Sequence, residues 1–154
     1  MDLDKTKKEI NVFFKYPELY NHLDYTAQAS IDYNNIKRKN GILDMFYNKL
    51  PFELTNQQKS DIRHPFAAAV LTQKYPEQLV RGLGQYKEDV DIINGKPLWD
   101  TEEDLKNNEL GIELGKKYPN MSPNNLFYLI LDEKNLAEPL KEPRFCDYFI
   151  NNDK

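Results

Sequence analysis

The sequence predicts an all-α fold, a single-domain helical bundle of five to seven helices. Apolar residues recur at helical spacing through most of the chain, and helix caps, prolines and glycines separate these segments. A length of 154 residues suits one compact domain with one hydrophobic core. No segment alternates convincingly between apolar and polar residues, apart from a weak pattern over residues 90–94.

Three helices are expected in the N-terminal third of the chain. Residues 3–15 place apolar side chains on one helical face, and Pro17 follows them. Residues 18–39 continue the helical spacing until Gly41 stops it. Residues 42–50 then form a short apolar helix that is closed by a proline.

Residues 55–75 predict a longer helix. Thr55 is followed three residues later by Gln58, which is the form of a capping box. Pro65 lies inside this segment, and because proline removes a backbone donor it predicts a kink or an interruption there.

Two more helices follow on either side of a turn. Residues 77–91 form the first, and the Asn-Gly pair at 94–95 marks the turn. The second covers residues 102–118, and either Asp100 or Thr101 is expected to cap it.

The last predicted helix begins after Ser122, with proline at its first position, and runs to about residue 135. The domain is therefore placed at residues 1–136, and residues 137–154 are expected to form a C-terminal arm. The predicted core consists of Phe13, Leu23, Leu43, Phe46, Phe66, Val70, Leu79, Leu83, Leu110, Leu114, Phe127 and Leu131.

Composition limits the classes of function. The net charge is −4 and no run of lysine or arginine stands out, which argues against binding to nucleic acid. Cys146 is the only cysteine, which excludes an intramolecular disulfide and a cysteine-rich zinc site. The sequence shows no signal peptide and no apolar membrane span. We expect synthesis in the cytoplasm, with export by a signal-independent secretion system left open.

Two of the predicted helices carry polar stripes that include glycine. Residues three, four and seven apart share a helical face, and glycine inside a helix costs about 1 kcal/mol relative to alanine. Such glycines are best explained by close approach of another backbone or a ligand. The first stripe consists of Arg81, Gly84, Glu88 and Asp91, and the second of Asp104, Asn108, Gly111 and Gly115.

A histidine on the preceding helix could join these stripes. His64 shares a face with Ala67 and Ala68, and such small residues would let a second helix approach closely. We therefore expect His64, together with the acidic and amide groups of both stripes, to surround one cavity. If these carboxylates are buried together, one of them should show a raised pKa or hold a cation.

Each residue of this set also has a simpler interpretation. Glu88 and Asp91 could lie on a solvated face, and Asp104 could compensate the free amides of a helix start. Arg81 could be an ordinary surface arginine or could neutralise the cluster. Taken together, the groups could bind a divalent cation, work as general acid and base without metal, or form a structural hydrogen-bond network.

The order along the chain of the histidine, the first polar stripe and the second polar stripe resembles the order in a loose group of mostly uncharacterised bacterial domains. Some are small envelope-associated proteins, and others are C-terminal domains of wall-associated and RHS-type polymorphic toxins. The resemblance covers about residues 55–118, and Pro65 departs from the alanine expected after the histidine. It implies that the polar residues belong together and that a secreted or injected toxin domain is plausible. The matching positions are Arg63, His64, Phe66, Lys87, Glu88, Asp91, Asp104, Leu105, Asn107, Asn108 and Gly111.

The leading hypothesis is a small bacterial hydrolase of the effector or toxin kind. Glu88 would be the general acid or base, with Asp91 and Asp104 as its carboxylate partners or as metal ligands. His64 would shuttle a proton or bind the metal, and a divalent cation is the one cofactor considered. Asn108 would orient the substrate or a water molecule.

Two arginines, Arg81 and Arg63, are the remaining candidates for substrate binding. The acidic balance of the chain favours peptidoglycan or another envelope polymer over nucleic acid as the substrate. The alternative is a non-enzymatic helical binding protein, such as an immunity, phage accessory or scaffold protein. In that case a cognate bacterial protein would be the partner, and the polar cluster would only fix helix packing.

Overall fold

The computed structural model describes residues 3–137, and every regular element in that range is an α-helix. Seven helices have eight residues or more, and α2 is a single turn of four residues. The all-α prediction is therefore confirmed. Of the predicted C-terminal arm, all but residue 137 lies outside the described residues, and so does Cys146. The helices are α1 (Leu3–Phe13), α2 (Pro17–Tyr20), α3 (Leu23–Lys37), α4 (Ile42–Lys49), α5 (Asn56–Thr72), α6 (Glu77–Ile93), α7 (Leu98–Lys117) and α8 (Pro123–Glu133).

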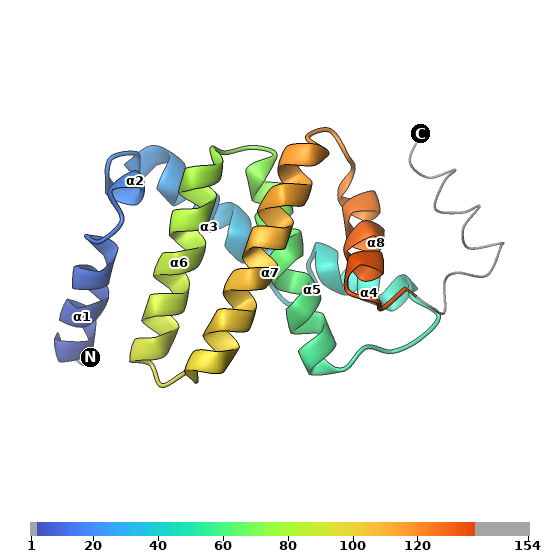
Figure 1. The fold of residues 1–154 in the computed structure, drawn as a ribbon, viewed down its shortest axis with the longest axis horizontal. Helices are drawn as coiled ribbons and strands as arrows, with labels where there is room; N and C mark the ends of the chain where they lie inside the picture. Colours follow the sequence, from blue (N-terminus) through green and yellow to red (C-terminus); the bar gives the residue numbers. More distant parts are fainter. Residues whose placement is uncertain (1–2, 138–154) are drawn as a thin grey trace.

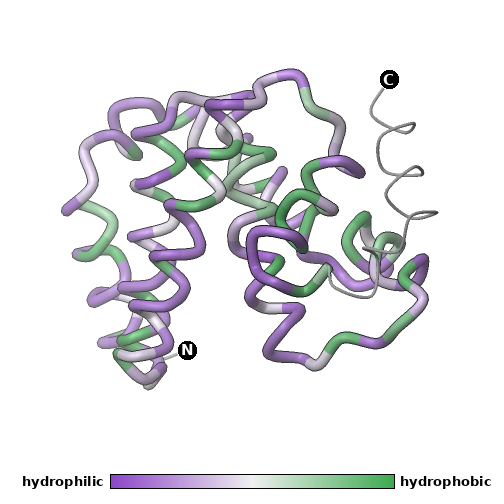
Figure 2. The backbone as a smooth tube through the Cα atoms, turned by 45° about the vertical axis from the view of Figure 1, so that its right-hand side comes forward, coloured by the Kyte–Doolittle hydropathy of each residue, from purple (hydrophilic) through white to green (hydrophobic). Residues whose placement is uncertain are grey.

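Three long helices form the centre of the bundle. In Figure 1, α6, α7 and α5 stand side by side, with α1 outside α6 and α8 outside α5. Figure 2 shows hydrophobic and hydrophilic residues along the backbone, and α5, at the centre of the bundle, buries residues 64–69 and 71, so more than one of its faces is covered. Within residues 3–137, no helix is long and apolar enough to cross a membrane.

Two of the predicted helix caps, those at Thr55 and Ser122, are present. The backbone N–H of Gln58 donates to Thr55 Oγ1 at 3.1 Å, and the backbone N–H of Thr55 donates to Gln58 Oε1 at 2.9 Å. These two bonds form the predicted capping box. Ser122 Oγ likewise accepts a bond from the backbone N–H of Asn125 at 3.2 Å and starts α8.

Helix α5 is not interrupted at Pro65, where a kink or an interruption is expected. Residues 90–93 belong to α6, so the weak alternating pattern there forms no strand, in line with the all-α prediction. Two other expectations were wrong. The predicted helix over residues 18–39 is divided into α2 and α3 at residues 21–22. The helix α7 starts at Leu98 with Pro97 at its N-cap, so neither Asp100 nor Thr101 caps it.

Two hydrophobic clusters form the core. The larger one lies among α4, α5 and α8, where the ring of Phe46 stacks on Phe127 with centroids 5.2 Å apart and meets Phe66 edge-on. The smaller one joins α2, α5, α6 and α7 around Leu19 and Ile112. Phe13, Val70, Leu83 and Leu110 are only partly buried, and they pack against these clusters.

Leu23 is the one predicted core residue that is exposed, with 59% of its surface accessible. The reason is the break at residues 21–22. It makes Leu23 the first residue of α3, so the helical register that placed Leu23 in the core does not extend across the break.

The helices α5 and α7 are in unusually close contact, and two glycines permit it. A Cβ atom added to Gly111 would lie 2.1 Å from the carbonyl oxygen of Pro65 and 2.8 Å from the Cβ of Ala68. A Cβ atom added to Gly115 would lie 2.5 Å from the carbonyl oxygen of Ala69. Real Cβ atoms do not approach backbone this closely, so only glycine fits at these positions.

Gly111→Ala is expected to destabilise the protein by about 1–3 kcal/mol, because α5 and α7 must separate to admit the methyl group. Gly82→Ala is the matched control, since its added Cβ would meet only the flexible side chain of Glu18. Chemical denaturation of both variants measures the difference. A Gly111→Ala protein as stable as the parent would contradict the close contact.

Candidate functional site

Four ionisable side chains meet where α5, α6 and α7 come together. We call them the polar cluster: His64 on α5, Glu88 on α6, Asp104 on α7, and Lys96 in the loop between α6 and α7. His64 Nε2 lies 3.2 Å from Asp104 Oδ2. Lys96 Nζ donates to Glu88 Oε2 at 2.8 Å and also donates to Asp104 Oδ2. The convergence predicted for His64, Glu88 and Asp104 is therefore confirmed.

The polar cluster is almost completely shielded from water. Glu88 is 0% exposed, Asp104 2% and His64 6%, whereas the side chain of Lys96 is 18% exposed. Charged residues are rarely buried to this extent unless they are paired. The pairing through Lys96 is what allows two carboxylates to remain side by side in the interior.

The environment pushes the pKa values of the two carboxyl groups apart. Burial raises the pKa of Glu88 above its ordinary value, and the nearby charge of Asp104 adds to this, although Lys96 and His64 oppose it. Burial also acts against ionisation of Asp104, but hydrogen bonds from His64 and Lys96 and their charges hold its pKa below the ordinary value. Burial acts to lower the pKa of Lys96, but the hydrogen bonds to both carboxylates and their charges outweigh it and raise this pKa, so the ammonium group stays charged.

Lys96 is positioned by the way in which α6 ends. Gly95 adopts a φ of +96°, its N–H bonds to the carbonyl of Ile92, and the N–H of Lys96 bonds to the carbonyl of Asp91. This is a Schellman motif, with glycine in the left-handed position that it requires. The predicted Asn-Gly turn is thus the element that returns Lys96 toward the carboxylates.

Three further predicted residues lie at the edges of the polar cluster. Asp91 Oδ2 is 3.7 Å from Lys96 Nζ, and the Asp91 side chain is 35% exposed. Asn108 is half-buried and lies against Gly84, where an added Cβ would come within 2.8 Å of its Nδ2. Arg63 precedes His64 and is also half-buried.

The interpretation of Arg81 as part of the polar set is not supported. Arg81 is exposed, and its guanidinium group bonds to Glu109 through Nε at 2.6 Å and to Glu77 at 3.4 Å. It therefore lies with the surface ion pairs. The capping interpretation of Asp104 also fails, because α7 begins six residues before it.

Two cavities adjoin the polar cluster and share His64 in their walls. The first, of about 220 Å³, is mainly apolar and is bordered by α3, α5, α6 and α7, with Glu88 and Asn108 in its lining. The second, of about 310 Å³, is polar and more open, with Asp104 and Lys96 in its lining. The cluster can therefore be reached from both sides by a small group.

Two carboxylate oxygens of the polar cluster have no hydrogen-bond partner within the described part of the chain. They are Glu88 Oε1 and Asp104 Oδ1, and both are fully buried. Buried acceptors normally receive a donor from protein or water, or coordinate a cation. His64, Glu88 and Asp104 each offer a ligand atom within 4.8 Å of the others. Lys96 Nζ already stands between the carboxylates, so a divalent cation bound here would displace it.

Sequence reasoning missed Lys96. Its signal was indirect: it follows a helix-ending Asn-Gly pair and separates two helices that both carry inward-facing carboxylates. A buried pair of carboxylates needs a cation, and Lys96 is the cation of that loop.

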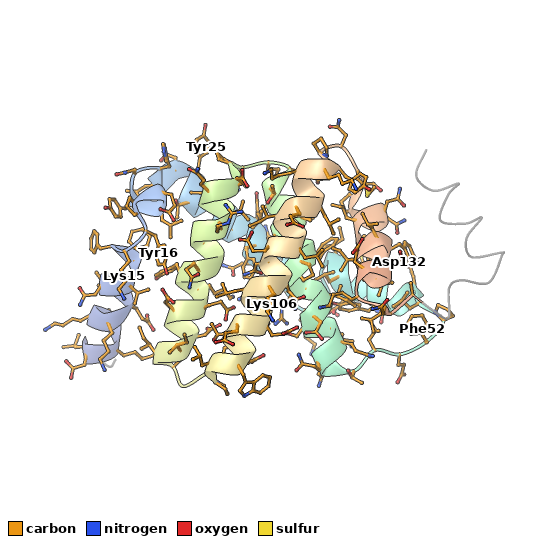
Figure 3. The ribbon with its side chains drawn as sticks, viewed as in Figure 1. Lys15, Tyr16, Tyr25, Phe52, Lys106 and Asp132 are labelled. Atoms are coloured by element: carbon orange, nitrogen blue, oxygen red, sulfur yellow. The ribbon has the colours of Figure 1, made fainter. Side chains whose placement is uncertain are left out.

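Lys96→Met is expected to lower the free energy of unfolding by about 3 kcal/mol, because it leaves two buried carboxylates without their cation. Lys106→Met is the control, since Lys106 is an exposed lysine on α7 (Figure 3) and its loss should change stability by less than about 0.5 kcal/mol. Urea denaturation at neutral pH gives both values. If both substitutions change the free energy of unfolding equally and only slightly, the ion pairs of Lys96 contribute nothing to stability.

The contribution of Asp104 to the stability of the folded protein should disappear at low pH. Its pKa in the folded protein lies below the ordinary 3.8, so the unfolded chain takes up the proton more readily. The stabilisation is therefore complete above the ordinary pKa and is lost as the pH falls through the folded value. The difference in stability between the parent and Asp104→Asn should be full above about pH 5 and narrow below about pH 4. A difference that does not vary with pH would contradict this.

Comparison with protein-family models, with curated proteins and with solved structures gave no match.

Proposed function

We propose that this protein is a small hydrolase whose acid–base centre consists of Glu88, His64 and Asp104. One observation carries the proposal. A fully buried carboxyl group with a raised pKa lies beside a buried histidine–aspartate pair, and the group borders a cavity. Pairs of titratable groups whose pKa values are driven apart are typical of acid–base catalysis.

The two carboxyl groups would have different roles. Glu88, whose raised pKa makes it take up a proton more readily than an ordinary glutamate, would donate that proton to a leaving group at the wall of the first cavity. Asp104, with its lowered pKa, remains ionised, orients His64 and stabilises the imidazolium that forms when His64 takes a proton from water.

Two neighbouring residues would assist. The amide of Asn108 lines the first cavity and can hold a substrate group or the attacking water. Asp91 lies near Lys96 at the rim and would act through that lysine, with which it forms an ion pair at 3.7 Å.

The cavity limits the size of what can bind. Pockets that enclose a drug-sized ligand have volumes of about 300–1,000 Å³, and the apolar cavity of about 220 Å³ is smaller. It would take one unit of a larger substrate. The resemblance to wall-associated and RHS-type toxin domains, and the acidic balance of the chain, favour an envelope polymer such as peptidoglycan.

A non-enzymatic binding protein is the second candidate, and one observation favours it. Lys96 bonds to both buried carboxylates and so neutralises the pair without any ligand. In an immunity, phage accessory or scaffold protein, this network would fix the packing of α6 on α7 and nothing more.

Targeting the protein to each compartment of a test bacterium would show where it acts. Expression in the periplasm should inhibit growth and release peptidoglycan fragments if the envelope polymer is the substrate. Expression in the cytoplasm should be harmless. Normal growth in both cases, with intact peptidoglycan, would contradict the toxin hydrolase.

Glu88→Gln separates catalysis from structure. Glutamine has nearly the same shape and resembles the protonated acid, so stability should change little while hydrolytic activity falls by about 10²–10⁴-fold. Glu113→Gln, an exposed glutamate on α7, is the control and should retain full activity. If Glu88 is only structural, the substitution should instead lower stability by about 1–3 kcal/mol. Melting temperature and activity on purified peptidoglycan would be measured for each variant.

A further inference from the structure

The second cavity is lined by side chains of both charges. Three aspartates, Asp91, Asp100 and Asp104, line it from the end of α6 and the first turns of α7, together with Lys96. The lining also includes three cations, which we call the basic wall: Lys37 at the end of α3, Arg63 on α5 and Lys87 on α6.

Two cations of the basic wall, Lys37 and Lys87, lie against one aromatic ring. Lys87 Nζ lies 4.2 Å and Lys37 Nζ 5.0 Å from the centroid of Tyr33. Burial, together with the charges of Lys87 and Arg63, lowers the pKa of Lys37. The ring holds both ammonium groups close to each other in spite of their mutual repulsion.

No acidic partner neutralises the basic wall. Among residues 3–137, no carboxylate oxygen lies within 4.0 Å of a side-chain nitrogen of Lys37, Arg63 or Lys87. Exposed lysines of the described chain, such as Lys106, also have no ion pair, because water solvates their charge. Arg63 and Lys87 differ from them, since both are half-buried at the edge of the same cavity and have less contact with water.

A second, independent observation is a buried donor of Arg63 that has no partner. Its Nε is buried and has no hydrogen-bond partner within the described chain. A guanidinium group has five N–H donors in a fixed fork that matches the two oxygens of a carboxylate or phosphate. A buried, unmatched donor beside two unpaired ammonium groups is the arrangement that an oxyanion would complete.

We infer that the basic wall, Lys37, Arg63 and Lys87, is a binding site for an oxyanion, either a carboxylate or a phosphoryl group of a ligand. The cavity of about 310 Å³ accommodates such a group. His64 lines the same cavity, so the bound oxyanion would lie beside the polar cluster. The inference does not depend on the proposed hydrolysis, because binding of an anion needs only the charges and donors of the basic wall.

Two pairs of neighbouring residues in the sequence contribute to both the polar cluster and the basic wall. Arg63 adjoins His64, and Lys87 adjoins Glu88. In each pair the second residue enters the polar cluster, while the first faces the second cavity as part of the basic wall. The pairs thus supply both the cluster and the oxyanion site from two helices.

The test is a titration of the full chain followed by NMR of its backbone amides. One arm uses inorganic phosphate, and the other uses an N-acetylated dipeptide with a free C-terminal carboxylate. Saturable shifts at amides around the basic wall in either arm support the site, and the arm with the tighter binding identifies the source of the oxyanion. Absence of saturable shifts in both arms would overturn it.

Charge-removing variants make the test specific. Lys87→Gln and Arg63→Gln should each weaken binding by about tenfold or more, because each removes a charged hydrogen-bond donor. Lys106→Gln removes the same charge from an exposed site on α7 and should leave binding unchanged. Equal weakening by Lys106→Gln would show non-specific attraction and overturn the site. Circular dichroism confirms that each variant is folded, and oxyanion binding without any hydrolysis would contradict only the proposed hydrolase.

Discussion

The close contact between α5 and α7 is the constraint on which the rest of the structure depends. Gly111 and Gly115 lie directly on the backbone of α5, against the carbonyl oxygens of Pro65 and Ala69. Because His64 and Asp104 lie on these same helices, the contact brings the imidazole within 3.2 Å of the carboxylate. Gly84 extends the arrangement to α6, since it leaves room for Asn108 and lets Glu88 face Asp104.

Burial of the polar cluster shifts the pKa values of its carboxyl groups. Two carboxylates, an imidazole and an ammonium group share a space that water hardly reaches, so small differences in contact separate their pKa values. Asp104 receives two donors and stays ionised, whereas Glu88 receives one and holds its proton more strongly. The basic wall, Lys37, Arg63 and Lys87, lines the second cavity together with aspartates, so the site presents both signs of charge to a ligand.

Much of this arrangement could be predicted from the sequence. Polar residues and glycines at spacings of three and four predicted that two helices face inward, and the small residues near His64 predicted the third. The helix caps at Thr55 and Ser122 could also be predicted from the sequence, because they depend only on local hydrogen bonds. The roles of Lys96 and Arg81 could not be predicted, since they depend on how a loop folds back and on which carboxylate lies nearest in space. The same holds for Leu23, whose exposure follows from the break between α2 and α3.

The central claim is that Glu88 and Asp104 form one buried, coupled pair with opposite pKa shifts. An NMR titration of the side-chain carboxyl carbons measures it directly. The structure predicts a pKa for Glu88 above its ordinary 4.5 and a pKa for Asp104 below its ordinary 3.8. Two carboxyl groups that titrate independently at their ordinary values would contradict the account, because that result requires both to be exposed and apart.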